Sequence, residues 1–148
     1  MHCGASRLTQ ALGPQMHSLL LLVALSATAS PMPQELAGVL PRLAGYDSRE
    51  CGVVELKQDP SEALTCALRS LSAGKSFWVA MRTQGEDSLL WSAAAQASDG
   101  SRWLVQFDSD ISGGGPKKKP LLEVIPCADL KISPAKPALI SCPSDWRR

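Results

Sequence analysis

The four cysteines that follow residue 50 constrain the fold of this chain more than any other feature. Cys51 and Cys66 are separated by the same number of positions as Cys127 and Cys142. Four cysteines allow three pairings, and the sequence leaves all three open. The equal spacing favours the two local pairs, each of which would contribute about 3 kcal/mol of stability through loop entropy. We therefore expect a small domain stapled by disulfides.

An apolar run, Leu19–Ala29, precedes these cysteines and indicates export. The run is about half the roughly 20 residues that a membrane-spanning helix needs. It ends in small residues, with an Ala-x-Ala pattern at 27–29 that suits signal peptidase. We expect residues 1–29 to be a signal peptide and the mature chain to be secreted or periplasmic, without a transmembrane segment. We expect translation to start at one of two methionines, Met1 or Met16.

Charge and histidine content argue against several functions. All the acidic residues and all but one of the basic residues, Arg7, lie beyond the signal, so the mature chain is neutral. A neutral chain without a dominant basic face does not predict nucleic-acid binding. Both histidines, His2 and His17, lie inside the signal, which removes the usual general base and the imidazole ligands of zinc. Because no C-x-x-C pair is present either, we predict no cofactor and no metal or redox role for the cysteines.

The mature chain divides into an N-terminal arm and one domain. Residues 30–50 contain three prolines and two glycines, which predicts an arm with at most one helical turn, near Gln34–Leu40, and no part in the core. Residues 51–148 form the domain. Its clearest element is a helix over 60–73, with a capping residue and a proline at its start and apolar residues at helical spacing.

Alternating apolar residues after that helix predict an antiparallel meander of three strands. These strands cover residues 77–82, 89–97 and 102–108. Two further extended pieces are expected at 121–125 and 138–142, the second returning beside the segment after Cys127. The fold class is therefore α+β, with one main helix packed on a four- to five-stranded antiparallel sheet. We expect the helix to cover the face that carries Trp103, Val105 and Phe107.

Six short motifs of the domain are turn-like. They are Cys51-Gly52, Cys66-Ala67, Gly74-Lys75-Ser76-Phe77, Gln84-Gly85-Glu86-Asp87-Ser88, Asp99-Gly100, and Asp108-Ser109-Asp110 before the triple glycine. With these motifs the chain resembles small exported bacterial α+β domains that contain disulfides and whose function is uncharacterised. The resemblance implies a helix packed on an antiparallel sheet and implies no activity.

The segment from Asp108 to Gly113 matches the first half of a calcium-binding loop. Asp108, Asp110 and Ser112 stand at positions that supply oxygen ligands, and the glycine permits a sharp turn. The second half does not match, because Lys119 stands where the bidentate glutamate belongs. We expect turn chemistry, in which the aspartates accept hydrogen bonds from loop amides. A calcium-stabilised structural domain is the alternative.

Carboxylates suggest a second chemical hypothesis, a small hydrolase that uses Asp87, Asp108 and Asp110. Sequence separation says nothing about the distance between these groups. Asp87 and Ser88 lie in a predicted hairpin turn, and without a histidine the serine would need a lysine such as Lys75 for activation. We therefore favour a protein that is not an enzyme.

Three tryptophans, one on each strand of the meander, are candidate binding residues. The candidates are Trp78, Trp91 and Trp103, which could share a face. If Trp78 and Trp91 lie on the side away from the helix, they would form an exposed aromatic patch suited to contact with a protein or a glycan. Packing in the core is the favoured alternative, because aromatic side chains of strands usually point inward.

Small size, disulfides and strand tryptophans together favour a non-catalytic interaction module outside the cytoplasm. The expected partner is a protein of the cell envelope or exterior, and inhibition of a secreted enzyme is one such role. The short basic run Lys117–Lys119 is expected to be a solvated loop.

Overall fold

The structure of the chain, a computed structural model, describes residues 32–113, 117 and 119–144. The expected signal peptide, residues 1–29, lies outside the described residues, together with its cleavage site near Ala29 and both candidate start methionines. No helix in the described part is long and apolar enough to cross a membrane.

Helices and strands alternate at the start of the described chain, and strands follow one another thereafter. The helices are α1 (Gln34–Ala44) and α2 (Ser61–Ser72). The strands are β1 (Arg49–Val54), β2 (Phe77–Gln84), β3 (Leu89–Gln96), β4 (Arg102–Asp108), β5 (Leu121–Pro126), β6 (Lys131–Ser133) and β7 (Leu139–Ser141).

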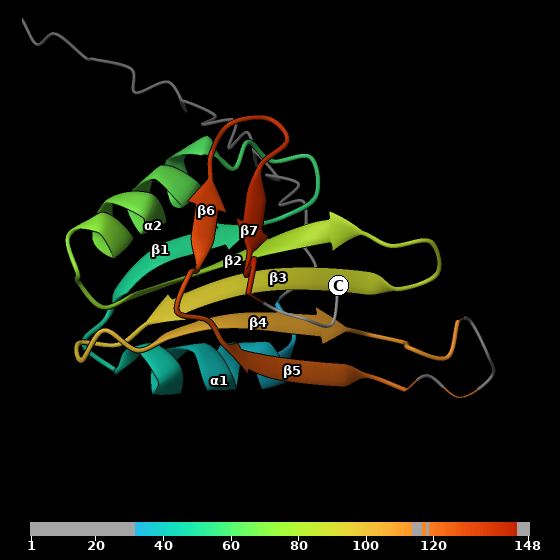
Figure 1. The fold of residues 1–148 in the computed structure, drawn as a ribbon. Helices are drawn as coiled ribbons and strands as arrows, with labels where there is room; N and C mark the ends of the chain where they lie inside the picture. The colour runs from blue at the N-terminus through green and yellow to red at the C-terminus, as the bar shows by residue number, and fades with distance from the viewer. Residues whose placement is uncertain (1–31, 114–116, 118, 145–148) are drawn as a thin grey trace, which may run out of the picture.

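The main sheet is mixed, which corrects the expected antiparallel sheet. Its five strands lie in the order β1-β2-β3-β4-β5 (Figure 1). Strands β2 to β5 pair antiparallel with one another in turn, whereas β1 runs parallel to β2. The cause is α2, which connects β1 to β2 as the crossover that parallel neighbours require. The sequence of β1 does not show the alternation of apolar and polar residues that identifies a strand. Its pairing with β2 shifts register between Glu50 and Val53, and this irregularity interrupts the alternation.

A second, two-stranded sheet contains β6 and β7. The extended piece expected at 138–142 is present as β7, and it returns beside the segment after Cys127 by pairing antiparallel with β6. Strand β7 therefore does not belong to the main sheet. The strand that joins β2 to β5 in the main sheet is β1.

One face of the main sheet is covered by α2 and the β6–β7 sheet (Figure 1). Leu64 and Ala67 of α2 are fully buried in one core with Phe77 and Val79 of β2. The same core includes Leu104, Ile125, Ile132 and Ile140. The helical spacing of apolar residues predicted this helix correctly.

The opposite face is covered by α1, which corrects the expected arm with at most one helical turn. Leu36, Leu40 and Ala44 recur every fourth residue, and all three are buried. Their core includes Trp78, Trp91 and Val105. Pro41 lies inside α1, where a proline costs about 3 kcal/mol. Burial of apolar side chains, at about 1.5–3 kcal/mol for each leucine, offsets that cost.

Strand alternation decides which helix covers which face. Neighbouring residues of a strand point to opposite sides, so Leu104 belongs to the core under α2 while Val105 belongs to the core under α1. The expectation that the helix over 60–73 covers the face of Trp103, Val105 and Phe107 is wrong, because α1 covers that face.

Both disulfides are the local pairs that equal spacing favours. Cys51–Cys66 joins β1 to α2, and Cys127–Cys142 joins the ends of β5 and β7, with Cα–Cα distances of 5.5 and 5.8 Å. Cys127 and Cys142 are 1% and 0% exposed. The two bonds therefore tie both covers of one face, α2 and the β6–β7 sheet, to the main sheet.

Gln96 is a buried amide whose two ends are both hydrogen-bonded. Its side chain is fully buried, its Nε2 donates to the Lys75 carbonyl at 3.0 Å, and its Oε1 accepts from the Arg102 Nε at 2.8 Å. Arg102 also donates to the Ala128 carbonyl at 3.0 Å. This network joins the turn before β2, strands β3 and β4, and the segment after β5.

Replacing Gln96 with Leu should lower the free energy of unfolding by about 1–3 kcal/mol, because the Lys75 carbonyl and the Arg102 guanidinium each lose a partly buried hydrogen bond. Urea denaturation followed by circular dichroism measures the change. Gln84→Leu, at the exposed end of β2, is the matched control and should change stability by less than about 0.5 kcal/mol. Equal losses in the two variants would contradict this role of Gln96.

Removing the second disulfide by Cys127→Ala with Cys142→Ala should lower stability by about 3 kcal/mol and loosen the β6–β7 sheet. Hydrogen exchange should therefore accelerate at Ile132 and Ile140 far more than at Val105, which lies in the other core. Uniform acceleration across both cores would show that the bond does not act locally.

Candidate functional site

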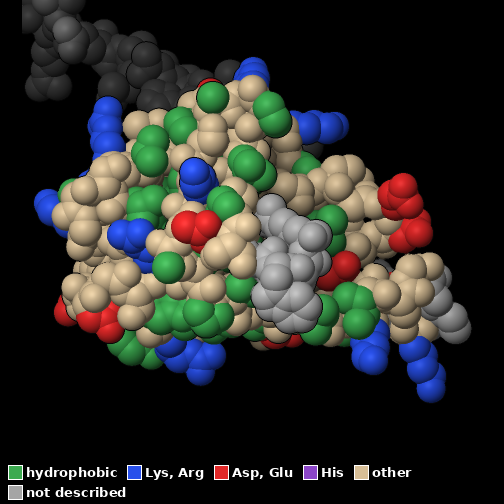
Figure 2. Space-filling view, in the orientation of Figure 1, with side chains coloured by type: hydrophobic (Ala, Val, Ile, Leu, Met, Phe, Trp, Pro, Cys, Tyr) green, Lys and Arg blue, Asp and Glu red, His purple; other side chains and the backbone are tan. Residues whose placement is uncertain are grey.

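Among the described residues, α2 and the β6–β7 sheet cover only part of their face of the main sheet, and the rest of that face forms a groove of about 280 Å³. We call this the open groove. It is lined by Thr83, Leu90, Trp91, Ser92, Gln106, Phe107, Asp108, Ile111, Leu121 and Glu123. Figure 2 shows acidic and hydrophobic side chains together on the right-hand part of this face.

Strand register places the groove side chains in two rows. Ser92 is paired with Gln106, and Gln106 with Glu123, which makes one polar row across β3, β4 and β5. In the next row Asp108 lies between two leucines, Leu90 of β3 and Leu121 of β5. Pairing of the strands therefore gathers polar and apolar groups that are far apart in the sequence.

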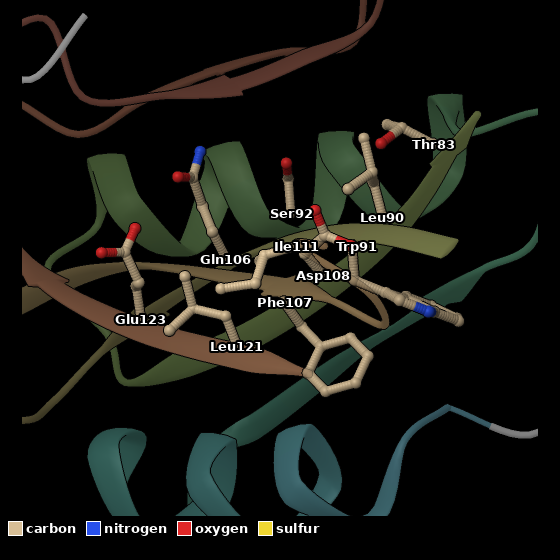
Figure 3. Close-up of a pocket in the computed structure, with 10 residues that line it drawn as sticks. All are labelled: Thr83, Leu90, Trp91, Ser92, Gln106, Phe107, Asp108, Ile111, Leu121 and Glu123. Carbon is tan, nitrogen blue, oxygen red and sulfur yellow. The ribbon is translucent and has the colours of Figure 1, made fainter. Parts of the chain in front are cut away.

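The floor of the groove separates its side chains from the core under α1. In Figure 3, Ser92, Gln106 and Glu123 point to one side of the sheet, whereas Trp91 and Phe107 point to the other side, toward α1. Trp91 and Phe107 are buried there. The groove is thus built on strands whose other face packs against α1 at Trp91 and Phe107, so its shape is held by the sheet.

The open groove carries negative charge beside an apolar rim. Asp108 and Glu123 are the acidic residues among the described lining. Ile111 and Leu121 are 46% and 40% exposed. The described part of the groove therefore combines carboxylates with an exposed apolar rim.

Aspartates of the candidate calcium loop bind backbone amides in the structure. Asp108 Oδ1 accepts from the Asp110 amide at 2.8 Å. Asp110 is 4% exposed, and its Oδ1 accepts from the amides of Ser112 at 3.0 Å and Lys119 at 3.2 Å. The Ser112 hydroxyl also donates to this carboxylate. These contacts are the turn chemistry that the sequence favours over calcium.

The candidate tryptophan surface does not form. Trp78 and Trp91 are 7% and 2% exposed because α1 covers them, and Trp103 packs against the same core. The three side chains do share a face, but it is the face that α1 buries. The favoured alternative, packing in the core, is what the structure contains.

Carboxylates of the hydrolase hypothesis do not converge in the open groove. Asp87 lies on the exposed turn between β2 and β3 and does not line the groove, whereas Asp108 does. Asp110 holds the loop after β4. Shared acid and base work by these three residues has no support in this arrangement.

The carboxyl groups with lowered pKa values lie at turns outside the groove. A hydrogen bond from the Ser61 hydroxyl, together with one from its amide, lowers the pKa of Asp59 before α2. The Ser101 amide and hydroxyl lower the pKa of Asp99 between β3 and β4. Both shifts follow from local turn hydrogen bonds.

Asp129 lies beside the second disulfide, a contact that the sequence did not suggest. Its Oδ1 lies 3.5 Å from Cys127 Sγ and 3.6 Å from Cys142 Sγ. These three residues have metal-ligating atoms within 4.8 Å of one another. Both sulfurs are bonded to each other, however, so neither is a thiolate ligand in this state.

Sequence reasoning missed the residues of the open groove. A signal was available, because Ser92, Gln106 and Glu123 occupy positions that continue the buried face of β3, β4 and β5 and are polar there. Polar residues at core-facing positions indicate that the cover ends. Only the pairing register shows that the three positions are neighbours.

Comparison with protein-family models, with curated protein sequences and with solved structures finds no match for this chain. The resemblance to small exported bacterial domains therefore stays a prediction.

Replacing Asp110 with Ala should lower the free energy of unfolding by about 1–3 kcal/mol, because the amides of Ser112 and Lys119 lose an acceptor. Thermal and urea denaturation measure the loss. Addition of calcium should leave the melting temperature of the wild-type protein unchanged, since turn amides already occupy this carboxylate. A melting temperature that rises with calcium would instead favour the calcium-stabilised domain.

Proposed function

We propose that this protein is a non-catalytic interaction module that works outside the cytoplasm and binds a partner protein through the open groove. The observation that carries the proposal is the incomplete cover of one sheet face. In the part of the chain that the structure describes, α2 and β6–β7 leave two rows of side chains uncovered, the polar row with Gln106 and the mixed row with Asp108.

The composition of the groove supports protein binding. Exposed apolar side chains at Ile111 and Leu121 adjoin polar groups of the same groove, and protein–protein interfaces combine an apolar centre with a polar rim in this way. The floor of the groove belongs to paired strands, and β3 and β4 pack against α1 on their other face, so little ordering of the binding site is required when a partner docks.

Disulfides and the dispersed carboxylates support the remaining parts of the proposal. Two disulfides are typical of proteins from oxidising compartments, which favours the secreted or periplasmic location. The non-catalytic assignment is supported by the separate places of Asp87 and Asp108 and by a mature chain expected to lack histidine.

Filling the groove should weaken partner binding. Ser92→Trp adds a large side chain where Ser92 points into the groove, so saturable binding of an envelope or extracellular protein should weaken by at least about tenfold. Lys131→Trp adds the same side chain at an exposed position of β6, outside the groove, and should bind as the wild type does.

Quantitative capture on the immobilised, oxidised protein measures both variants, with thermal melts as the check on folding. Equal binding by the two variants, or the absence of any saturable partner, would contradict the proposed function.

A further inference from the structure

The two disulfides differ in burial, although their cysteines have the same spacing in the sequence. Cys127 and Cys142 are 1% and 0% exposed, whereas Cys51 and Cys66 are both partly exposed. Thiol–disulfide exchange begins when a thiolate attacks one sulfur of the bond, so its rate depends on access to that sulfur. Burial therefore separates a protected bond from a bond that an external thiol can reach.

The exposed bond lies at the periphery of the main sheet. Strand β1 stands at one end of the strand order, and α2 lies over it (Figure 1). Cys51 lies within the shift of register between Glu50 and Val53, where the pairing of β1 with β2 is irregular. Cys66 lies in the middle of α2. The bond therefore joins the outermost strand to the helix that covers it.

A surface hollow of about 460 Å³ reaches Cys66. We call this the Cys66 hollow. Its described lining consists of Arg49, Ser61, Glu62, Thr65, Cys66 and Arg69. A small thiol that enters the hollow therefore meets Cys66 of the bonded pair.

Charge in the Cys66 hollow favours an anionic reagent. Arg49 and Arg69 bring two positive charges to the described lining, and Glu62 brings one negative charge. Both the attacking group and the leaving group of thiol exchange are thiolates, which positive surroundings stabilise. The hollow therefore suits the reaction electrostatically as well as sterically.

A second hollow, of about 310 Å³, is lined by both cysteines of the exposed bond. The charged residues of its described lining are Arg49, Glu50, Asp59 and Glu62, so its net charge is negative. Like charges repel, so a thiolate is disfavoured there. Approach through the Cys66 hollow is favoured instead, with Cys66 as the attacked sulfur and Cys51 as the leaving sulfur.

The buried bond has the opposite electrostatic environment. Asp129 Oδ1 lies 3.5 Å from Cys127 Sγ and 3.6 Å from Cys142 Sγ. A carboxylate at this distance repels an attacking thiolate, and it destabilises whichever sulfur leaves as a thiolate. Burial and charge therefore protect the same bond.

We propose that Cys66 is a site of thiol–disulfide exchange, and that external thiols open the Cys51–Cys66 bond before the Cys127–Cys142 bond. A thiolate of a dithiol reagent attacks Cys66 Sγ and forms a mixed disulfide. The electron pair of the broken bond goes to Cys51 Sγ, which takes a proton from water. The second thiol of the reagent then attacks the mixed disulfide and releases Cys66. The protein gains two electrons and two protons, and the reagent becomes a disulfide.

Opening this bond removes the covalent link between α2 and β1, while the other bond still joins the β6–β7 sheet to the main sheet. The two bonds therefore have separate roles, one responsive to thiols and one structural. This inference depends neither on the open groove nor on its partner.

Timed reduction of the purified, disulfide-bonded chain tests the proposal. Free thiols, Cys3 included, are blocked with iodoacetamide, dithiothreitol is added under native conditions, and N-ethylmaleimide labels the new thiols at intervals. Peptide mass spectrometry should find Cys51 and Cys66 labelled at least about tenfold faster than Cys127 and Cys142. Equal rates, or faster labelling of the buried pair, would overturn the proposal.

Reduced glutathione identifies the attacked sulfur. Because glutathione has a single thiol, rapid alkylation of the leaving cysteine traps the mixed disulfide. We expect glutathione on Cys66 and N-ethylmaleimide on Cys51. The reverse assignment would make Cys51 the exchange site and would contradict the role of the Cys66 hollow.

Charge variants test the electrostatic argument. Arg69→Gln should slow the reaction with glutathione by about threefold, and Glu62→Gln should speed it by a similar factor. Arg42→Gln, on the helix that covers the opposite face, is the matched control and should react as the wild type does. Rates that stay equal in all three variants would contradict a charge effect at Cys66.

Asp129→Asn tests the protection of the buried bond. Removing this charge should speed reduction of Cys127–Cys142 by about threefold or more and leave reduction of Cys51–Cys66 unchanged. Thermal melts before reduction check that the variant is folded. Equal acceleration of both bonds would mean that lost stability, and not lost charge, controls their reduction, and it would contradict the protective role of Asp129.

Discussion

The fold depends on burying apolar side chains on both faces of β2, β3 and β4. Because neighbouring residues of a strand point to opposite faces, each face needs its own cover. Helix α1 buries Trp78 and Trp91 on one face, and α2 with β6–β7 buries Val79 and Leu104 on the other. This requirement explains why the N-terminal segment is a helix despite Pro41: without α1, two tryptophans would be exposed to water.

The two covers end at different places, and this difference creates the open groove. The sheet face that α2 and β6–β7 cover extends beyond them. Its part outside the cover carries the polar row of Ser92, Gln106 and Glu123. Disulfides join both of these covers to the sheet, so the border of the groove is held in place. A site held in this way loses little entropy when it binds a partner, which suits an interaction module.

Local signals predicted a large part of the fold. Helical spacing identified α2, alternation identified β2 to β5, and equal cysteine spacing favoured both disulfides. These features succeed because each depends on residues close together in the chain. Helix α1 was missed because Pro41 interrupts its helical pattern. Strand β1 was missed because a register shift between Glu50 and Val53 interrupts its alternation. The candidate site was missed for a different reason: Ser92 and Glu123 become neighbours only through β4, which pairs with both of their strands.

By itself, the sequence determined the local elements, the disulfide-stapled α+β class and the turn chemistry of Asp110, since period, spacing and capping act over short distances. Only the tertiary structure decided which helix covers which face, and with it whether Trp91 is a surface or a core residue. It also decided where, among the described residues, the cover of the sheet ends. The physical reason is that burial is a property of the whole packed molecule, so no single segment carries it.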